Sequence, residues 1–228
     1  MAESKKAVFF GELLMRLAAR RYERLVQARE FEIGYTGAEA NAAVSLANYG
    51  MDDLNYRRKL WTPEKARRVL TDLMQHVDVL MGNEEDSTLV LGVAAQGVDV
   101  ARGELDAERY KEVAAELHRR FGFKYVATTL RESLSASENG WSCLLSDGRQ
   151  CYLSRQYRIW VVDRVGGGDA FSGGLIYALL SGMSAQDSVE FAAAASCLKH
   201  SIHGDFNQVN REEVMALVRG GGSGRIQR

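Results

Sequence analysis

Apolar and polar residues follow one another along the chain in blocks of two kinds. Short apolar runs are typical of strands, and they occupy residues 7–11, 31–35, 77–81, 125–129 and 159–162. Longer stretches with apolar residues three and four positions apart predict helices at residues 36–49, 62–74, 106–120, 170–181, 185–199 and 211–219. Strands that alternate with helices in this way predict an α/β fold.

A β-hairpin interrupts this alternation. Residues 141–145 and 150–153 have the character of strands, and Asp147 and Gly148 between them favour a turn. Cys143 and Cys151 can face each other in this hairpin, but reduced cysteines that simply pack in the core are the favoured interpretation. Residues 93–105 are expected to form a loop.

Length and charge narrow the class of protein. The chain of 228 residues can form one large domain, and its 29 Lys and Arg against 30 Asp and Glu give no electrostatic sign of nucleic-acid binding. No apolar run reaches the length of a membrane span, and residues 1–7 are too polar for a signal peptide. The 3 cysteines form no Cys-x-x-Cys pair, which favours the reducing cytoplasm and argues against a structural zinc.

The most informative stretch is residues 161–174, where a strand ends, glycines follow and a helix begins. Gly166, Gly167 and Gly168 allow a turn that side chains would block. Free N–H groups at the start of the next helix, together with the helix dipole, can bind an anion. Asp169 would repel that anion, but it suits a base that deprotonates a hydroxyl attacking a phosphorus atom. On these residues alone, a plain glycine-rich turn capped by Asp169 is an equally good explanation.

No Gly-Lys-Ser/Thr follows the glycines, so this is not a Walker A loop. Instead, residues 163–169 resemble the second signature of the ribokinase-like (PfkB-type) sugar kinases. Leu-Asn-Tyr-Arg with Leu-Trp in residues 54–61, and Thr-Leu-Arg-Glu-Ser in residues 129–133, are similar to the 2-keto-3-deoxygluconate kinases of that family. The resemblance implies a three-layer α/β/α sandwich with a mostly parallel central sheet. It also implies ATP-dependent phosphorylation of a sugar acid, 2-keto-3-deoxygluconate, at a primary hydroxyl.

The resemblance also assigns roles to residues. Asp169 would be the catalytic base, Gly166, Gly167 and Gly168 would stabilise the developing charge, and Arg57 would neutralise carboxylate and phosphate. The residues expected at the substrate are Gly37, Ala38, Asn41, Arg57 and Asp169. Those expected at ATP are Asn55, Arg57, Asn83, Thr129, Arg131, Gly166, Gly168 and His200. Asn83 and Asp86 would hold Mg²⁺ through water, and Asp163 would hold a monovalent cation such as K⁺.

For several of these residues a plainer interpretation stays open. Asn41 can lie on a solvent-exposed helix face, and Arg131 can be an ordinary solvated arginine. Glu84 and Glu85 can complement the dipole of a helix.

One part of the family pattern is absent. The stretch with Arg57 follows directly on residues 51–53, where the family has a small domain's worth of additional chain that includes a β-sheet lid. Either the chain carries an internal deletion or the sequence joins two pieces of a longer one. We expect a single ribokinase-like domain over residues 1–228 without the lid. Residues 1–52 would be a sugar-site fragment and residues 53–228 the nucleotide-binding and catalytic half.

Two alternative functions remain open at this point. One is a nucleotide-binding remnant without kinase activity, and the other is a kinase of another sugar or of a nucleoside. Loss of central strands would also expose apolar neighbours, so a marginally stable protein that associates into a homo-oligomer is a further expectation.

Overall fold

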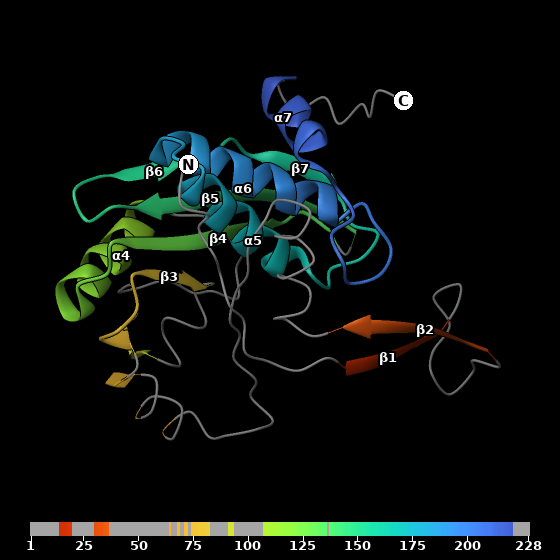
Figure 1. The fold of residues 1–228 in the computed structure, drawn as a ribbon, viewed down its shortest axis with the longest axis horizontal. Helices are drawn as coiled ribbons and strands as arrows, with labels where there is room; N and C mark the ends of the chain where they lie inside the picture. Colours follow the sequence, from red (N-terminus) through yellow and green to blue (C-terminus); the bar gives the residue numbers. More distant parts are fainter. Residues whose placement is uncertain are drawn as a thin grey trace, which may run out of the picture.

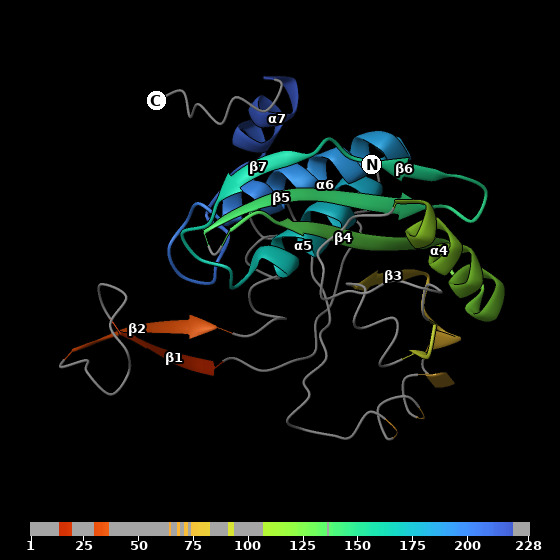
Figure 2. The same ribbon diagram turned by 180° about the vertical axis from the view of Figure 1, so that it is seen from behind.

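The computed structural model describes residues 14–19, 30–36, 64, 68, 71–72, 74–82, 91–93, 107–135 and 137–220. The strands are β1 (Leu14–Ala19), β2 (Phe31–Thr36), β3 (Val79–Gly82), β4 (Tyr125–Ser133), β5 (Glu138–Ser146), β6 (Cys151–Leu153) and β7 (Tyr157–Trp160). The helices with full bounds are α4 (Ala107–Phe121), α5 (Gly167–Leu180), α6 (Ala185–Lys199) and α7 (Arg211–Arg219). Figures 1 and 2 show their arrangement from opposite sides.

In the described part of the chain, the main sheet has 5 strands in the order β3-β4-β5-β6, with β7 also paired to β5. Strand β3 runs parallel to β4, with Val79 opposite Tyr125, whereas β5 is antiparallel to β4, β6 and β7. The predicted α/β class is confirmed. The expected parallel arrangement holds for β3 and β4, but the sheet as described is mixed. Strands β1 and β2 form a separate antiparallel pair.

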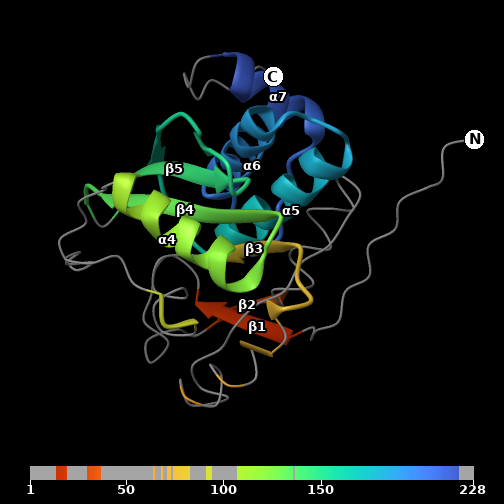
Figure 3. The same cartoon turned by 90° about the vertical axis from the view of Figure 1, so that its left-hand side faces the viewer.

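Helices cover both faces of the main sheet, as Figure 3 shows for α4 on one side and α5 and α6 on the other. Alternate residues of β4 point to opposite faces. Val126 and Leu130 pack with Leu117 of α4, while Ala127 belongs to the core with Phe171 of α5. The predicted three layers are therefore present, and each face of the sheet has its own hydrophobic core.

Helices α5 and α6 form an antiparallel pair whose backbones approach closely. A β-carbon on Gly174 would lie 3.1 Å from the α-carbon of Ala192 and 3.2 Å from the β-carbon of Ala195. Ala192 and Ala195 are both fully buried, so small residues on both helices make this distance possible. The alanine-rich part of α6 is therefore a tightly packed element of the core.

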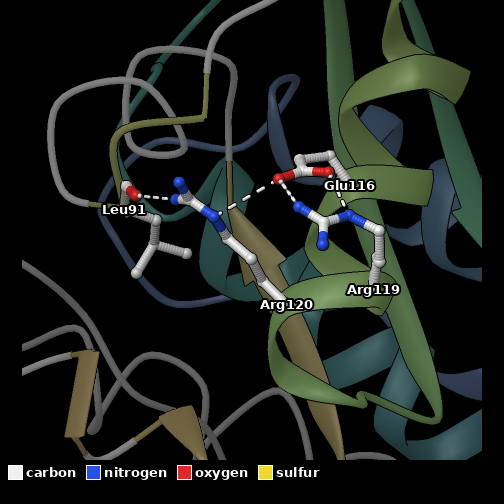
Figure 4. A network of polar contacts seen from close by, with 4 residues as sticks. All are labelled: Leu91, Glu116, Arg119 and Arg120. Carbon is white, nitrogen blue, oxygen red and sulfur yellow. Dashed lines mark hydrogen bonds and ion pairs between the residues drawn. The ribbon is translucent and has the colours of Figure 1, made fainter.

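A short segment at Leu91 is held against α4 (Figure 4). Arg120 Nη1 donates to the Leu91 carbonyl at 3.0 Å, and Glu116 binds Arg119 at 2.7 Å and Arg120 at 3.3 Å. Exposed ion pairs of this kind contribute little, about 0–1 kcal/mol each. Burial of the Leu91 side chain beside Leu117 is the larger contribution.

Several element boundaries differ from those expected from the sequence. Strand β4 continues to Ser133 instead of ending at Thr129, and β7 ends at Trp160 instead of Val162. Helix α5 begins at Gly167 rather than at Ala170, whereas α6 and α7 have the predicted limits. Strand β1 is an element that the apolar pattern did not reveal. The strand predicted at residues 7–11 lies outside the described residues, as do residues 37–49 of the helix predicted at residues 36–49.

The predicted hairpin is present as β5 and β6. Its register places Cys151 opposite Ser146, so Cys143 and Cys151 do not face each other. All three cysteines are free thiols, as the favoured interpretation held. None of the helices in the described part of the chain combines the length and apolar character that crossing a bilayer requires.

The buried position of Leu175 yields a stability prediction. Leu175→Ala should lower the free energy of unfolding by about 2–5 kcal/mol, because the fully buried side chain leaves a cavity between α5 and its neighbours. Leu180→Ala on the same helix is the matched control, since Leu180 is 37% exposed and its loss should cost less than about 1 kcal/mol. Urea unfolding measures both, and equal losses would contradict the packing described here.

Candidate functional site

The glycine turn that precedes α5 has a backbone shape that requires glycine at its first position. Gly166 is the N-cap of α5 and has φ 80°, in the left-handed region. A β-carbon there would lie 2.0 Å from the Asp205 carbonyl oxygen, closer than any real contact. Helix α5 starts directly after it, because Ala170 N–H donates to the Gly166 carbonyl at 2.9 Å. The turn and the loop after α6 are thus in direct backbone contact.

The first turn of α5 has the features of an anion site. Backbone N–H groups at the start of a helix lack partners within the helix and carry the positive end of its dipole. Gly168 is exposed, and a β-carbon on it would meet nothing within 4 Å, so there is open space beside this turn. Asp169 follows in the same turn and is 9% exposed. The structure therefore brings the predicted base and Gly166–Gly168 together at one helix end.

Ser196, near the C-terminal end of α6, and His200, the C-cap of that helix, contact the glycine turn. Ser196 Oγ donates to the Gly167 carbonyl at 2.7 Å. A β-carbon on Gly167 would lie 2.5 Å from His200 Cε1, so the imidazole lies directly against the backbone of the turn. The same ring lies 4.6 Å from the ring of Trp141, between centroids. His200, predicted at the nucleotide, thus lies beside the glycines.

The environment of His200 favours its neutral form. Burial lowers its pKa, and the charges of Lys199, Arg164 and Arg131 lower it further. The hydrogen bond between Nδ1 and the Ser196 carbonyl, at 2.7 Å, opposes these effects by raising the pKa. A carbonyl accepts only from a protonated nitrogen, so we assign the proton of the neutral ring to Nδ1. Nε2 then presents a lone pair near Gly167.

Thr129 lies within strand β4 as predicted, and Arg131 does too, because the strand continues beyond its predicted end at residue 129. The polar end of β4 continues as a strand because it pairs with β5, where Arg131 lies opposite Trp141 and Thr129 opposite Cys143. Alternation along β4 directs both residues to the face that α5 and α6 cover. The charge of Arg131 also acts on His200, so the structure brings this predicted residue to the same region.

Asp163 connects the turn to the loop after α6. Its Oδ1 accepts from Val165 N–H at 3.1 Å, and its Oδ2 accepts from Gly204 N–H at 3.2 Å. The main chain reinforces this connection, because Val162 N–H donates to the His200 carbonyl at 2.8 Å. Asp163 therefore has a structural role, and its role at a monovalent cation stays a prediction.

The remaining predicted site residues cannot be placed. Gly37, Ala38, Asn41, Asn55, Arg57, Asn83 and Asp86 all lie outside the described residues. In the part of the chain that the structure describes, no three His, Cys, Asp or Glu side chains gather as a metal site would need. The Mg²⁺ site at Asn83 and Asp86, and the substrate contacts of Arg57 and Asn41, stay predictions.

Three polar residues near the turn were not identified from the sequence: Ser196, Lys199 and Asp205. Ser196 and Lys199 are 0% exposed and Asp205 is 5% exposed. One signal was available, since Ser196 and Lys199 interrupt the largely apolar run at the end of α6. A polar residue in such a run needs a partner, and here the partners belong to the glycine turn and the loop beside it.

Comparisons with known proteins point to one family. The sequence profile of the pfkB family carbohydrate kinases matches residues 48–210. A 2-dehydro-3-deoxygalactonokinase of Haloferax volcanii is 32% identical over 83% of this chain and 53% of its own length. A 2-dehydro-3-deoxygluconokinase of Thermoproteus tenax is 29% identical over 67% of this chain and 41% of its own length. The chain spans about half the length of the curated relatives it matches.

A solved structure agrees with these relatives. The crystal structure of a 2-dehydro-3-deoxygluconokinase from Thermotoga maritima superposes with a TM-score of 0.87 and is 30% identical, covering 94% of this chain and 99% of that chain. Its likeness, together with that of the relatives, supports the ribokinase-like fold expected from the signature at residues 163–169.

The contact at Gly166 yields a prediction on the turn. Gly166→Ala should lower the free energy of unfolding by more than about 2 kcal/mol, because alanine is strained at positive φ and its β-carbon would meet Asp205 O. A β-carbon on Gly168, two positions further along, would meet no atom within 4 Å. Gly168→Ala should therefore leave the free energy of unfolding unchanged or raise it by up to about 1 kcal/mol. Urea unfolding of both variants is the measurement, and similar losses for the two would be inconsistent with the close approach.

The lowered pKa of His200 predicts a pH dependence of stability. Between the ordinary histidine value of 6.5 and the lower pKa in the folded protein, only the unfolded chain binds this proton. The free energy of unfolding should therefore decrease as the pH falls below 6.5. Replacing His200 by Gln should remove part of that decrease. Denaturant titrations from pH 5 to 8 compare the slopes; an unchanged slope in His200→Gln would contradict the assignment.

Proposed function

Because the chain belongs to the pfkB family of carbohydrate kinases, we propose that it transfers the terminal phosphoryl group of ATP to a primary hydroxyl of a sugar acid. The observation that carries this proposal is the first turn of α5, where exposed Gly168 and buried Asp169 stand side by side. Backbone N–H groups at the start of a helix can hold a phosphoryl group, and a carboxylate beside them can accept a proton.

The proposed reaction is a direct phosphoryl transfer. The carboxylate of Asp169 accepts the proton of the substrate hydroxyl as its oxygen forms a bond to the terminal phosphorus of ATP. The bond between that phosphorus and the bridging oxygen breaks, and ADP leaves with the electron pair. Backbone N–H groups of the turn at Gly166–Gly168 stabilise the charge on the phosphoryl oxygens during the transfer.

The residues around the turn have supporting roles in this proposal. His200 and Ser196 fix the position of Gly167 through direct contacts with it. Arg131 reaches the same region from β4 and offers a positive charge to the nucleotide phosphates. Mg²⁺, when bound with ATP, would neutralise phosphate charge, and Asn83 and Asp86 are the residues we propose to hold it. Arg57 and Asn41 are proposed to bind the acid substrate.

The substrate class is proposed from the relatives. The similar proteins of Haloferax volcanii and Thermoproteus tenax are named as kinases of 2-dehydro-3-deoxygalactonate and 2-dehydro-3-deoxygluconate. We propose a 2-keto-3-deoxy sugar acid, with 2-keto-3-deoxygluconate as the first compound to test. A panel of acceptors that includes fructose, ribose and a nucleoside distinguishes this choice from other substrates of the same family.

A second candidate is a protein that binds nucleotide without transferring phosphate. Calorimetric titration separates the two candidates. Heat on addition of both ATP and the keto-acid supports the kinase, whereas heat from ATP alone supports the second candidate.

The role of Asp169 can be tested directly. Asp169→Asn keeps the size of the side chain but cannot accept the proton, so turnover should fall by about 10²–10⁴-fold. ATP binding should remain close to that of the wild type. Asp187→Asn is the matched control, because Asp187 lies in the first turn of neighbouring α6 and caps it with Ser184. A coupled assay of ADP release measures both variants, and a near-wild-type rate for Asp169→Asn would exclude Asp169 as the base.

A further inference from the structure

The end of α6 carries a fully buried lysine that the proposed reaction does not use. Lys199 is 0% exposed, although lysine is almost never fully buried without a specific environment for its charge. Its Nζ donates to the Ile202 carbonyl at 3.3 Å. Its Cε lies 3.1 Å from the position of a β-carbon on Gly166, the same position that Asp205 O approaches to 2.0 Å. The ammonium group therefore lies directly beneath the glycine turn.

The surroundings of Lys199 suit a positive charge. It is the last residue of α6, where the helix dipole is negative and carbonyl groups lack helical partners. The chain forms one further turn after α6, in which Ile202 N–H donates to the Lys199 carbonyl at 3.0 Å. Two acidic residues belong to the same unit: Asp163, held by Gly204 N–H, and Asp205, whose carbonyl touches Gly166.

This is also the place where a monovalent cation was expected from the sequence, with Asp163 as its ligand. Both carboxylate oxygens of Asp163 accept backbone N–H groups, and the nearby Ile202 carbonyl accepts from the Lys199 ammonium. The groups that a bound K⁺ would use are thus already engaged by donors of the chain itself. The donor set fits an internal ammonium group better than an exchangeable ion.

We propose that the Lys199 ammonium is a fixed internal cation of the glycine turn. It holds the loop at residues 201–206 against Gly166 and supplies positive charge beneath the anion site, so that K⁺ is not needed there. Lys199 is a positioning residue, because it acts through the turn and not on the reacting atoms. The proposal rests on the proposed function only in identifying the bound anion as a nucleotide phosphate.

The consequence is a protein whose anion site does not respond to the kind of monovalent cation in solution. An ammonium on a covalent tether is present at every salt concentration and cannot exchange for Na⁺ or K⁺. Removal of the tethered charge should create a site that a small cation can fill, whereas a bulky cation such as tetramethylammonium is too large to enter it. The dependence on K⁺ should therefore be absent in the wild type and appear in a variant without the charge.

The test compares KCl with tetramethylammonium chloride at equal ionic strength, with thermal unfolding and ADP binding as two separate measurements. For the wild type, the melting temperature and the ADP affinity should be the same in both salts. Lys199→Met should melt at a lower temperature and bind ADP about tenfold more weakly in tetramethylammonium chloride, with partial recovery of both in KCl. Lys124→Met, at a lysine whose side chain is 70% exposed, is the matched control and should behave as the wild type.

Each result decides the proposal. Higher wild-type stability or ADP affinity in KCl than in tetramethylammonium chloride would show an exchangeable cation and overturn it. A Lys199→Met variant that shows no salt dependence and no loss would overturn it as well. If that variant does not fold, the wild-type comparison alone decides. If the wild type binds no ADP in either salt, the proposed function fails, while the melting temperatures still test the role of Lys199.

Discussion

The approach of the Asp205 carbonyl to the α-carbon of Gly166 is the contact on which the site depends. The oxygen lies where a β-carbon would be, at 2.0 Å, so only glycine allows the two backbone segments to be this close. Around this contact, Gly204 N–H reaches Asp163 and Val162 N–H reaches the His200 carbonyl. These bonds make the start of α5 and the loop after α6 a single structural unit.

The antiparallel pairing of α5 and α6 gives this unit its electrostatic character. It places the positive end of one helix dipole beside the negative end of the other. Lys199 at the end of α6 compensates the negative end, and burial together with nearby cations keeps His200 neutral. The start of α5 keeps the positive end of its own helix dipole, and this is where we propose that a phosphate binds. The distribution of charge at the site therefore depends on the start of α5 lying beside the end of α6.

Much of the fold could be predicted from local patterns. The limits of α6 and α7 were correct because both helices have strong caps: Ser184 accepts from Asp187 N–H, and Asn210 and Glu213 form a capping box. The strand limits were less accurate. The polar end of β4 lacks a strand pattern and becomes a strand through pairing with β5, as at Arg131 and Trp141. Strand β1 forms in a similar way through its partner β2.

The sequence by itself determined the turn, the helix that follows it and the kinds of chemical group at the site. Glycines before Asp169 permit a tight turn that other residues would not allow. Because this constraint is local, neighbouring residues in the sequence are enough to predict it. Only the tertiary structure decided that Lys199 and His200 are buried beneath this turn and that Asp205 touches it. Those properties arise from contacts between residues distant in the chain, and burial, which sets the protonation of His200, is a property of the packed molecule rather than of any local pattern.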